Sequence, residues 1–394
     1  MTPLVLADEN IPGVQACLGP RFRVEHFEGR RLTPDRLAGA DALLVRSVTP
    51  VNATLLEGSA LRFVGTATSG MDHIDRDYLR TRGIAFAHAP GANANSVVEY
   101  VLAAIAHCDD FLERLLAGGR VGVVGYGHIG QALAVRLQAL GIDRVVYDPW
   151  LAADAIPRAA DLASVLACDV VSLHCELTDR TPWPSKHLIG SAELLAMTRQ
   201  SLLINASRGA VVDNPALLDH LLAHTAGPRV VLDVWEGEPA IDTALLEHVC
   251  LGTAHIAGYS YDGKLLATRL LCAALRAQLP DAPPCSEPAA QSLQEAALTS
   301  SEARILRLPS GLSGASLVRF LLRERYDIKQ DDAWLRAAAI ASGAAGIGRH
   351  FDALRRDYRQ RRELAGSRVS GGQLCAEDAA LVRALGCEYR SEPE

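Results

Sequence analysis

The stretch from Arg120 to Trp150 constrains the fold more than any other part of the chain. Val121 to Val124 is a short apolar run, which predicts a buried strand. Gly125, Gly127 and Gly130 follow it directly with the spacing G-x-G-x-x-G. A glycine pattern of this kind is informative only when a helix and a second strand come after it, and both are predicted here.

The helix is predicted from a set of apolar residues that ends near Gly141: Ile129, Leu133, Val135, Leu137 and Leu140. The next strand, Arg144 to Tyr147, brings Asp148 to its carboxyl end. Strand, glycine turn, helix, strand and acid together predict the βαβ unit of a Rossmann domain.

Each residue type in this unit suits a dinucleotide. Glycines permit the tight turn and let the backbone approach a pyrophosphate, and the amino terminus of the helix offers N–H groups to the phosphates. A carboxylate such as Asp148 accepts hydrogen bonds from both ribose hydroxyls and repels a 2′-phosphate. The sequence therefore predicts NAD, rather than NADP, as the cofactor.

Composition excludes several classes of protein. The 394 residues predict two or three domains, and 46 acidic against 39 basic residues, a net charge of −7, argue against a nucleic-acid partner. No apolar run is long enough for a membrane span, and the first residues lack the basic flank of a secretory signal. The 9 cysteines form no C-x-x-C pair, so we expect free thiols in the cytoplasm. The 12 histidines show no zinc-ligand spacing, so no metal is expected.

The order of the predicted strands and helices gives a domain plan. Alternating strands and helices in residues 3–90 predict a small parallel sheet, and one long helix over 92–117 leads into the dinucleotide unit. The helix after His255 is expected to cross back to the first domain, and a Pro-, Ser- and Ala-rich linker follows over 282–301. The fold class is therefore α/β with two Rossmann-like parallel-sheet domains, the NAD domain being inserted in a discontinuous substrate domain. The expected boundaries are 1–92 with 259–282 for the substrate domain, 93–258 for the NAD domain, and 283–394 for a C-terminal α+β domain.

Three reactive side chains follow predicted strands of the NAD domain: Arg208, Glu238 and His255. Taken singly, each is better explained as a surface arginine, a loop acid or a core histidine. Together at one sheet edge they suit oxidation of a 2-hydroxy acid. The guanidinium can hold the carboxylate in two parallel hydrogen bonds, and the imidazole can take the hydroxyl proton while the acid orients its ring.

Polar residues also end two strands of the first domain. Arg46 and Ser47 follow one strand, and Thr68 lies in a Thr-Ser-Gly segment after another. Ligands bind at the carboxyl ends of strands in open α/β sheets, so both segments are candidate anion sites.

These motifs make the chain resemble a known family. The segments LADENIP, LLVRSVTPVN, FVGTATSGMDHID, NASRGAVVDN, LDVWEGEP and AHIAGYSYDGK are similar to the D-isomer-specific 2-hydroxyacid dehydrogenases. YDIKQDDAWLR and FDALRRDYRQRRE extend the similarity to the C-terminal domain and resemble the erythronate-4-phosphate dehydrogenases in particular.

The resemblance implies roles for individual residues. Arg208, Glu238 and His255 fall on catalytic positions, and Ser47, Thr68 and Tyr259 on substrate positions. Arg46 is added to the substrate set by its charge alone. The positions implied to bind NAD are Gly125, Gly127, His128, Ile129, Gly130, Asp148, Cys175, Ala206, Ser207, Arg208, Asp233 and Gly258. Cys175 stands where the family often has threonine.

The implied reaction is the NAD-dependent oxidation of 4-phospho-D-erythronate to (R)-3-hydroxy-2-oxo-4-phosphooxybutanoate, in pyridoxal 5′-phosphate biosynthesis. The resemblance also implies a homodimer formed through residues 283–394. Two alternatives stay open: a dehydrogenase for another 2-hydroxy acid, such as 3-phosphoglycerate or glycerate, and a non-catalytic dimer that senses NAD. The arginines between Arg349 and Arg362 suggest a further hypothesis, in which Arg355 or Arg359 reaches the active site of a partner subunit.

Overall fold

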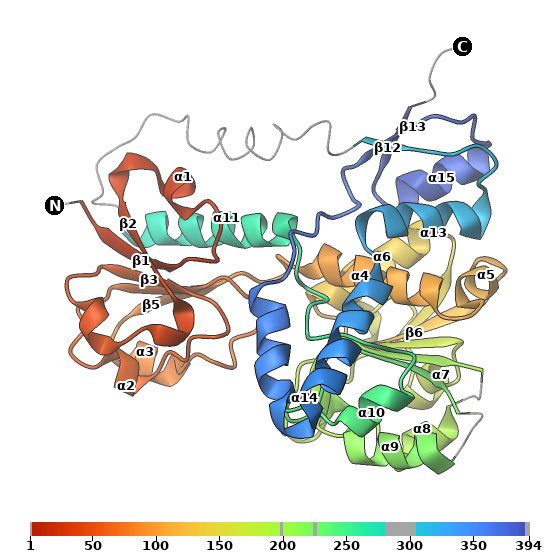
Figure 1. Cartoon of the computed structure of the whole chain (residues 1–394), viewed down its shortest axis with the longest axis horizontal. Coiled ribbons are helices and arrows are strands. Elements are labelled where there is room, and N and C mark those ends of the chain that lie inside the picture. Colours follow the sequence, from red (N-terminus) through yellow and green to blue (C-terminus); the bar gives the residue numbers. More distant parts are fainter. Residues whose placement is uncertain (1, 198–199, 224–226, 280–304, 391–394) are drawn as a thin grey trace. The chain divides into compact units, whose positions relative to one another are not determined.

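The computed structural model describes residues 2–197, 200–223, 227–279 and 305–390. The chain forms two compact units (Figure 1), one from Met1–Asn93 with Ser260–Ala303 and one from Ala94–Tyr259 with Arg304–Glu394. The linker predicted over 282–301 lies outside the described residues. The second unit thus includes the C-terminal residues, which were predicted as a separate domain, and the three-domain division stays a prediction.

The first unit contains a parallel sheet in the order β2-β1-β3-β4-β5. Its strands are β1 (Leu4–Asp8), β2 (Arg23–Phe27), β3 (Ala42–Val45), β4 (Phe63–Thr66) and β5 (Ala85–His88). The helices are α1 (Val14–Leu18), α2 (Ala53–Leu56), α3 (Arg76–Thr81) and α11 (Tyr261–Gln278). Successive strand residues are buried on opposite faces, Leu43 in one core and Leu44 in the other, which explains why these strands read as continuous apolar runs.

Helix α11 confirms the predicted discontinuity of this domain. Its residues Leu271 and Leu275 are fully buried and pack in one core with Val5 and Phe63 of the sheet. Because α11 follows residues 94–259 in sequence, the first unit can complete its core only after that part of the second unit has been synthesised.

The second unit contains a parallel sheet in the order β11-β10-β9-β8-β6-β7. Its strands are β6 (Arg120–Val124), β7 (Asp143–Tyr147), β8 (Val170–Leu173), β9 (Leu202–Asn205), β10 (Arg229–Leu232) and β11 (Leu251–Gly252). The helices are α4 (Ala94–His107), α5 (Phe111–Leu116), α6 (His128–Ala139), α7 (Leu162–Leu166), α8 (Ser191–Ala196), α9 (Asn214–Ala223) and α10 (Thr243–His248). Strand order reverses beside β6, and ligands of open α/β sheets bind at such a point.

Two local expectations differ from the structure. The single helix predicted over 92–117 is divided into α4 and α5, because Asp109 between them has a φ of 39°, in the left-handed region that ends a helix. Val135, counted among the apolar residues of α6, is 67% exposed.

The C-terminal residues form helices around a small parallel sheet, β12 (Ile305–Arg307), β13 (Arg368–Ser370) and β14 (Glu388–Arg390). The helices are α13 (Gly314–Arg325), α14 (Ile328–Arg356) and α15 (Ala376–Ala384). Leu317 and Leu321 of α13 share a core with α4, while Ile347 and Phe351 of α14 share another with Trp235. The C-terminal segment is therefore part of the hydrophobic core of the second unit.

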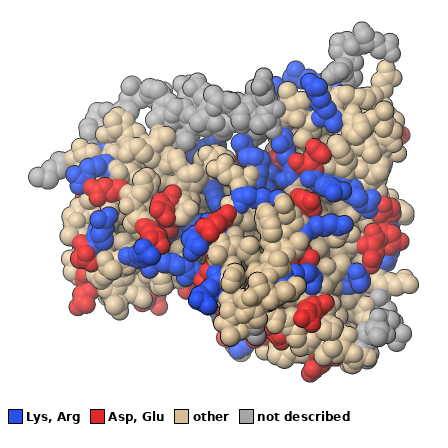
Figure 2. All heavy atoms as spheres, in the orientation of Figure 1, with Lys and Arg blue, Asp and Glu red and all other residues tan. Residues whose placement is uncertain are grey.

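On the face drawn in Figure 2, basic side chains are interspersed with acidic ones. Among the described helices, none combines the length and the apolar composition needed to cross a bilayer.

Candidate active site

The glycine turn after β6 has the shape that a dinucleotide requires. Gly125 has a φ of 92°, and a Cβ there would lie 2.6 Å from the backbone nitrogen of Cys175. A Cβ on Gly130 would lie 2.0 Å from the carbonyl oxygen of Gly125, so the helix and the turn can approach this closely only because residue 130 is glycine. A Cβ on Gly127 would meet no atom within 4 Å, which leaves its side open beside the amino terminus of α6. His128 and Ile129 form the first turn of that helix.

Asp148 lies at the end of β7, next to this turn. One oxygen of its carboxylate accepts the N–H of Tyr126 at 2.8 Å, and the other accepts the N–H of Trp150 at 3.1 Å. The backbone therefore holds the carboxylate in place at the edge where the ribose of a dinucleotide would lie. These residues fit NAD.

The ends of β8 and β9 supply further cofactor positions. Burial raises the pKa of the Cys175 thiol to about 12, so this side chain is a neutral thiol. Ala206 and Ser207 are buried, and Asn205 accepts hydrogen bonds from both the N–H and the hydroxyl of Ser207, at 3.1 and 2.8 Å. The loop leading to Arg208 is thereby fixed.

Arg208 follows directly and donates to the carbonyl oxygen of Ser207 at 2.8 Å. A Cβ on Gly209, the next residue, would lie 1.9 Å from the carbonyl carbon of Trp235. The loops after β9 and β10 are therefore in direct backbone contact, and the loop after β10 carries Glu238.

Glu238 and His255 form a hydrogen-bonded pair, with 2.7 Å between Oε2 of Glu238 and Nδ1 of His255. The other oxygen of Glu238 accepts the N–H of Trp235 at 2.8 Å. Burial opposes ionisation of Glu238, but the His255 ring, the Trp235 N–H and the guanidinium of Arg355 hold the pKa of this carboxyl below its usual value. With Nδ1 assigned as the donor to the carboxylate, Nε2 of His255 is left to exchange a proton with a substrate.

Asp233 holds the segment that carries His255. It is 2% exposed and accepts the Thr253 hydroxyl at 2.6 Å and the N–H groups of Ile256 and Ala257 at 2.8 and 2.9 Å. Asp233, which was predicted to bind the cofactor, therefore also stabilises the turn at His255 through its carboxylate.

Gly258 and Tyr259 end the same segment. The Tyr259 N–H donates to the carbonyl oxygen of Ile256 at 2.8 Å, and its ring meets that of Tyr358 edge-on, with 5.8 Å between centroids. A side chain of the C-terminal segment therefore lies against a predicted substrate residue.

The other predicted substrate residues lie in the first unit, at the ends of β3 and β4. Nε of Arg46 lies 3.4 Å from the buried carboxylate of Asp8, and Ser47 beside it is exposed. The hydroxyl of Thr68 donates to the carbonyl oxygen of Gly70 and hydrogen-bonds the Thr66 hydroxyl, both at 2.8 Å.

Sequence reasoning missed Lys264, which lies near Arg46 and Asp8. Burial, followed by the positive charge of Arg46, lowers the pKa of Lys264 to about 8. Lys264 and Arg46 are two positive charges near a single carboxylate, that of Asp8. Binding of an additional anion beside them would therefore be favourable. The available signal was a lysine in the first turn of the helix, within the motif AGYSYDGK.

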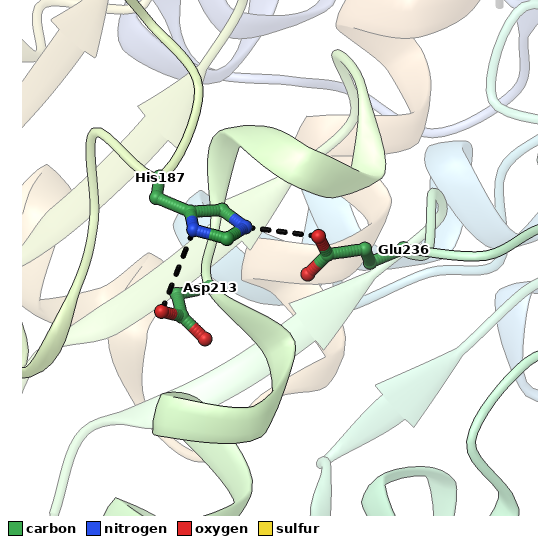
Figure 3. Close-up of side chains that lie close together, drawn as sticks. All are labelled: His187, Asp213 and Glu236. Atoms are coloured by element: carbon green, nitrogen blue, oxygen red, sulfur yellow. Dashed lines mark hydrogen bonds and ion pairs between the residues drawn. The ribbon is translucent and has the colours of Figure 1, made fainter.

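One group of side chains among the described residues has the donor types of a metal site: His187, Asp213 and Glu236. Figure 3 shows the imidazole between the two carboxylates, with Nε2 2.9 Å from Glu236 and Nδ1 3.5 Å from Asp213. Both ring nitrogens already have a carboxylate partner. We therefore interpret these contacts as structural, because they link the three loops that carry His187, Asp213 and Glu236.

Comparisons with known proteins agree with this geometry. Residues 98–257 match the family model described as the NAD binding domain of D-isomer specific 2-hydroxyacid dehydrogenases, and residues 298–386 match a domain of unknown function, DUF3410. The chain resembles a D-lactate dehydrogenase structure from Aquifex aeolicus, complexed with NAD and lactic acid, with a TM-score of 0.57 and 23% identity over 71% of this chain and 96% of that one. This likeness shows the fold.

The curated relatives cover nearly the whole chain. The erythronate-4-phosphate dehydrogenase of Cellvibrio japonicus is 44% identical over 91% of this chain and 93% of its own length. That of Salinibacter ruber is also 44% identical, over 97% and 98%. Residues 98–257 of the second unit accordingly form an NAD-binding domain, and the chain is an oxidoreductase acting on a CH–OH group that belongs to the erythronate-4-phosphate dehydrogenase family.

Proposed function

We propose that this protein oxidises C2 of 4-phospho-D-erythronate with NAD to give (R)-3-hydroxy-2-oxo-4-phosphooxybutanoate, a step of vitamin B6 biosynthesis. The observation that carries the proposal is the 2.7 Å pair of Glu238 and His255 at the carboxyl edge of the NAD-binding sheet, in the loops next to Arg208. The names of the relatives support this choice of substrate.

The pair acts as a proton acceptor. Nε2 of His255 takes the proton of the C2 hydroxyl, and the carboxylate of Glu238 stabilises the imidazolium that forms. NAD, when bound, supplies the acceptor for the hydride. Arg208 holds the substrate carboxylate in two parallel hydrogen bonds, which fixes C2 for reaction.

The substrate phosphate is assigned to the first unit. Arg46 and Lys264 supply positive charge beside Asp8, and the exposed hydroxyl of Ser47 supplies a donor. Thr68 and Tyr259 are proposed to contact the substrate, as the resemblance implies.

NAD is proposed to bind along the carboxyl edge of the second sheet. The turn from Gly125 to Gly130 would hold the pyrophosphate, and the Asp148 carboxylate would accept hydrogen bonds from the ribose hydroxyls. The remaining contacts would come from residues that follow the other strands: Cys175, Ala206, Ser207, Arg208, Asp233 and Gly258.

We also propose that the protein is a cytoplasmic homodimer. Apolar side chains of α14 support a second copy, since Ile340 is 87% exposed and Trp334 is 39% exposed. The dispersed free cysteines suit a reducing compartment. Light scattering on the purified chain and on Ile340→Asp tests the dimer.

NADH formation from 4-phospho-D-erythronate, measured against D-glycerate, 3-phosphoglycerate and D-lactate, tests the reaction. We expect a kcat/KM for 4-phosphoerythronate far above the others, and loss of turnover with retained NAD binding in Arg208→Ala and His255→Ala. Preference for another acid would overturn the substrate assignment. NAD binding without turnover of any acid would favour the non-catalytic sensor.

A further inference from the structure

The last turn of α14 brings a cation from the C-terminal segment to the catalytic loops. Cζ of Arg355 lies 5.9 Å from the centre of the Tyr259 ring, and the two side chains hydrogen-bond. Nε of Arg355 is buried and has no hydrogen-bond partner among the described residues. A half-buried arginine with a buried Nε beside a predicted substrate residue is not accounted for by surface solvation.

Packing fixes the position of this arginine. Phe351, one helical turn before it, is fully buried in the same core as Trp235, whose loop carries Glu238. A Cβ on Gly348 would lie 3.6 Å from Pro239, the residue after Glu238. Helix α14 therefore rests directly on the loop that orients His255.

A second side chain of the segment supports Tyr259 from another direction. The ring of Tyr358 meets it edge-on at 5.8 Å, and the Tyr358 hydroxyl donates to the carboxylate of Asp331 at 2.7 Å. Asp331 is 4% exposed, so this support is anchored in the interior of the segment.

The charges around Arg355 keep its guanidinium ionised. Burial opposes the charged form, but Tyr259, Glu238 and Asp233 outweigh it and raise the pKa of Arg355. In return, Arg355 is one of the groups that favour the ionised form of Glu238. The positive charge of Arg355 and the negative charges of Glu238 and Asp233 therefore stabilise one another.

We propose that Arg355 is a positioning residue of this chain's own active site, where it holds the Tyr259 ring in place and complements the charge of Glu238. The inference rests on the proposed function and adds that the C-terminal segment completes the site on the same chain. The hypothesis of a contribution to a partner subunit is not needed for Arg355, and Arg359 lies over Trp334 with 5.3 Å from Cζ to the ring centre.

The test compares Arg355→Gln and Arg355→Lys with Arg356→Gln in the full-length protein. Arg356 is the exposed neighbour on the same helix and pairs with Asp357, so its variant is a matched control for charge and fold. For each protein, kcat and KM for 4-phosphoerythronate, NAD affinity by fluorescence, and thermal unfolding are measured.

We expect Arg355→Gln to lower kcat/KM by roughly 100-fold, the effect of misplacing a substrate contact by about 1 Å. NAD affinity should stay near that of the wild type, and Arg355→Lys should recover part of the loss because it keeps the charge and one donor. Arg356→Gln should behave as the wild type does. In a cycle with Tyr259→Phe, the two substitutions should be strongly non-additive, because both remove the same contact.

Each unfavourable result identifies what is wrong. If the wild type does not oxidise 4-phosphoerythronate, the proposed function fails, and Arg355 is then tested on the acid that the enzyme does oxidise. If the wild type turns over and a folded Arg355→Gln has unchanged kcat and KM, the positioning role is refuted. The positioning role would also be refuted if Arg355→Gln and Arg355→Lys lost kcat/KM equally and these losses were additive with the loss in Tyr259→Phe.

Discussion

Replacement of Glu238 by glutamine perturbs the catalytic pair without changing its size. The amide oxygen can keep the N–H of Trp235, which lies 2.8 Å from Oε1 of Glu238. The amide NH₂ then takes the place of Oε2, 2.7 Å from Nδ1 of His255. Two donors cannot face each other at that distance. Nδ1 must therefore accept, and the ring proton moves to Nε2, the atom that has to receive the hydroxyl proton.

The structure gives the size of the effect. The two side chains are 31% and 19% exposed, so the pair is partly shielded from water. Truncating one member of a hydrogen-bonded charge pair in such a setting costs about 2–5 kcal/mol. Each 1.36 kcal/mol of barrier is a factor of ten, so a cost of about 3–4 kcal/mol lowers kcat by about 10²- to 10³-fold. In a serine protease triad, the same exchange of carboxylate for amide costs about 10⁴ in kcat through the wrong tautomer.

Initial rates of NADH formation measure this loss, and fluorescence titration shows whether NAD still binds. Glu247→Gln is the matched control, because Glu247 is an exposed acid on α10 of the same unit. A folded Glu238→Gln that binds NAD and retains kcat within about threefold of the wild type would refute the reasoning, since a loss of only ~0.7 kcal/mol is too small for this pair.

Three further outcomes are expected. Asp148→Ala should weaken NAD binding by about 10- to 100-fold, which corresponds to the loss of a charge-assisted hydrogen bond. It should also lower the KM for NADP, and steady-state kinetics with both nucleotides will check both effects. Cys175→Thr should tighten NAD binding by about fivefold in binding titrations, because a hydroxyl, a stronger hydrogen-bonding group, replaces a neutral thiol. Burial, with Glu363 nearby, raises the pKa of Glu99 from 4.5 to about 7, so the folded state binds this proton more tightly than the unfolded state does. Stability should therefore fall by about 3 kcal/mol as pH rises from about 4.5 to 7, and Glu99→Gln should remove that slope in denaturant unfolding at fixed pH values.

Residues that lie within short motifs could be placed from sequence alone. The turn at Gly125 and the acid at Asp148 are joined by one strand–helix–strand unit, so their proximity follows from local structure. Glu238 and His255 follow β10 and β11, two neighbouring parallel strands whose carboxyl ends meet at one edge. Sheet topology alone therefore brings this acid and imidazole close together.

Val135 was wrongly placed on the buried face of α6 because the helical repeat of about 3.6 residues was not applied to it. Leu133 and Leu137 are four residues apart and share one face of α6, whereas Val135, two residues from each, points to the opposite side. Lys264 was missed for another reason. Its proximity to Arg46 depends on how α11 packs on the first sheet, and no local spacing encodes that packing.

The C-terminal segment shows where reasoning from motifs ends. Its arginines could be recognised as unusual in an acidic chain, but charge does not say which of them lies against the catalytic loops. Arg355 and Arg356 are adjacent, yet one lies against Tyr259 and the other pairs with an exposed aspartate. The difference comes from Phe351, which docks one face of α14 on the core around Trp235 and so turns only the residue one turn later toward the catalytic loops. Arg355 lies at this active site because Phe351, four residues before it, is buried against the core around Trp235. This position depends on tertiary packing and cannot be inferred from a local sequence motif.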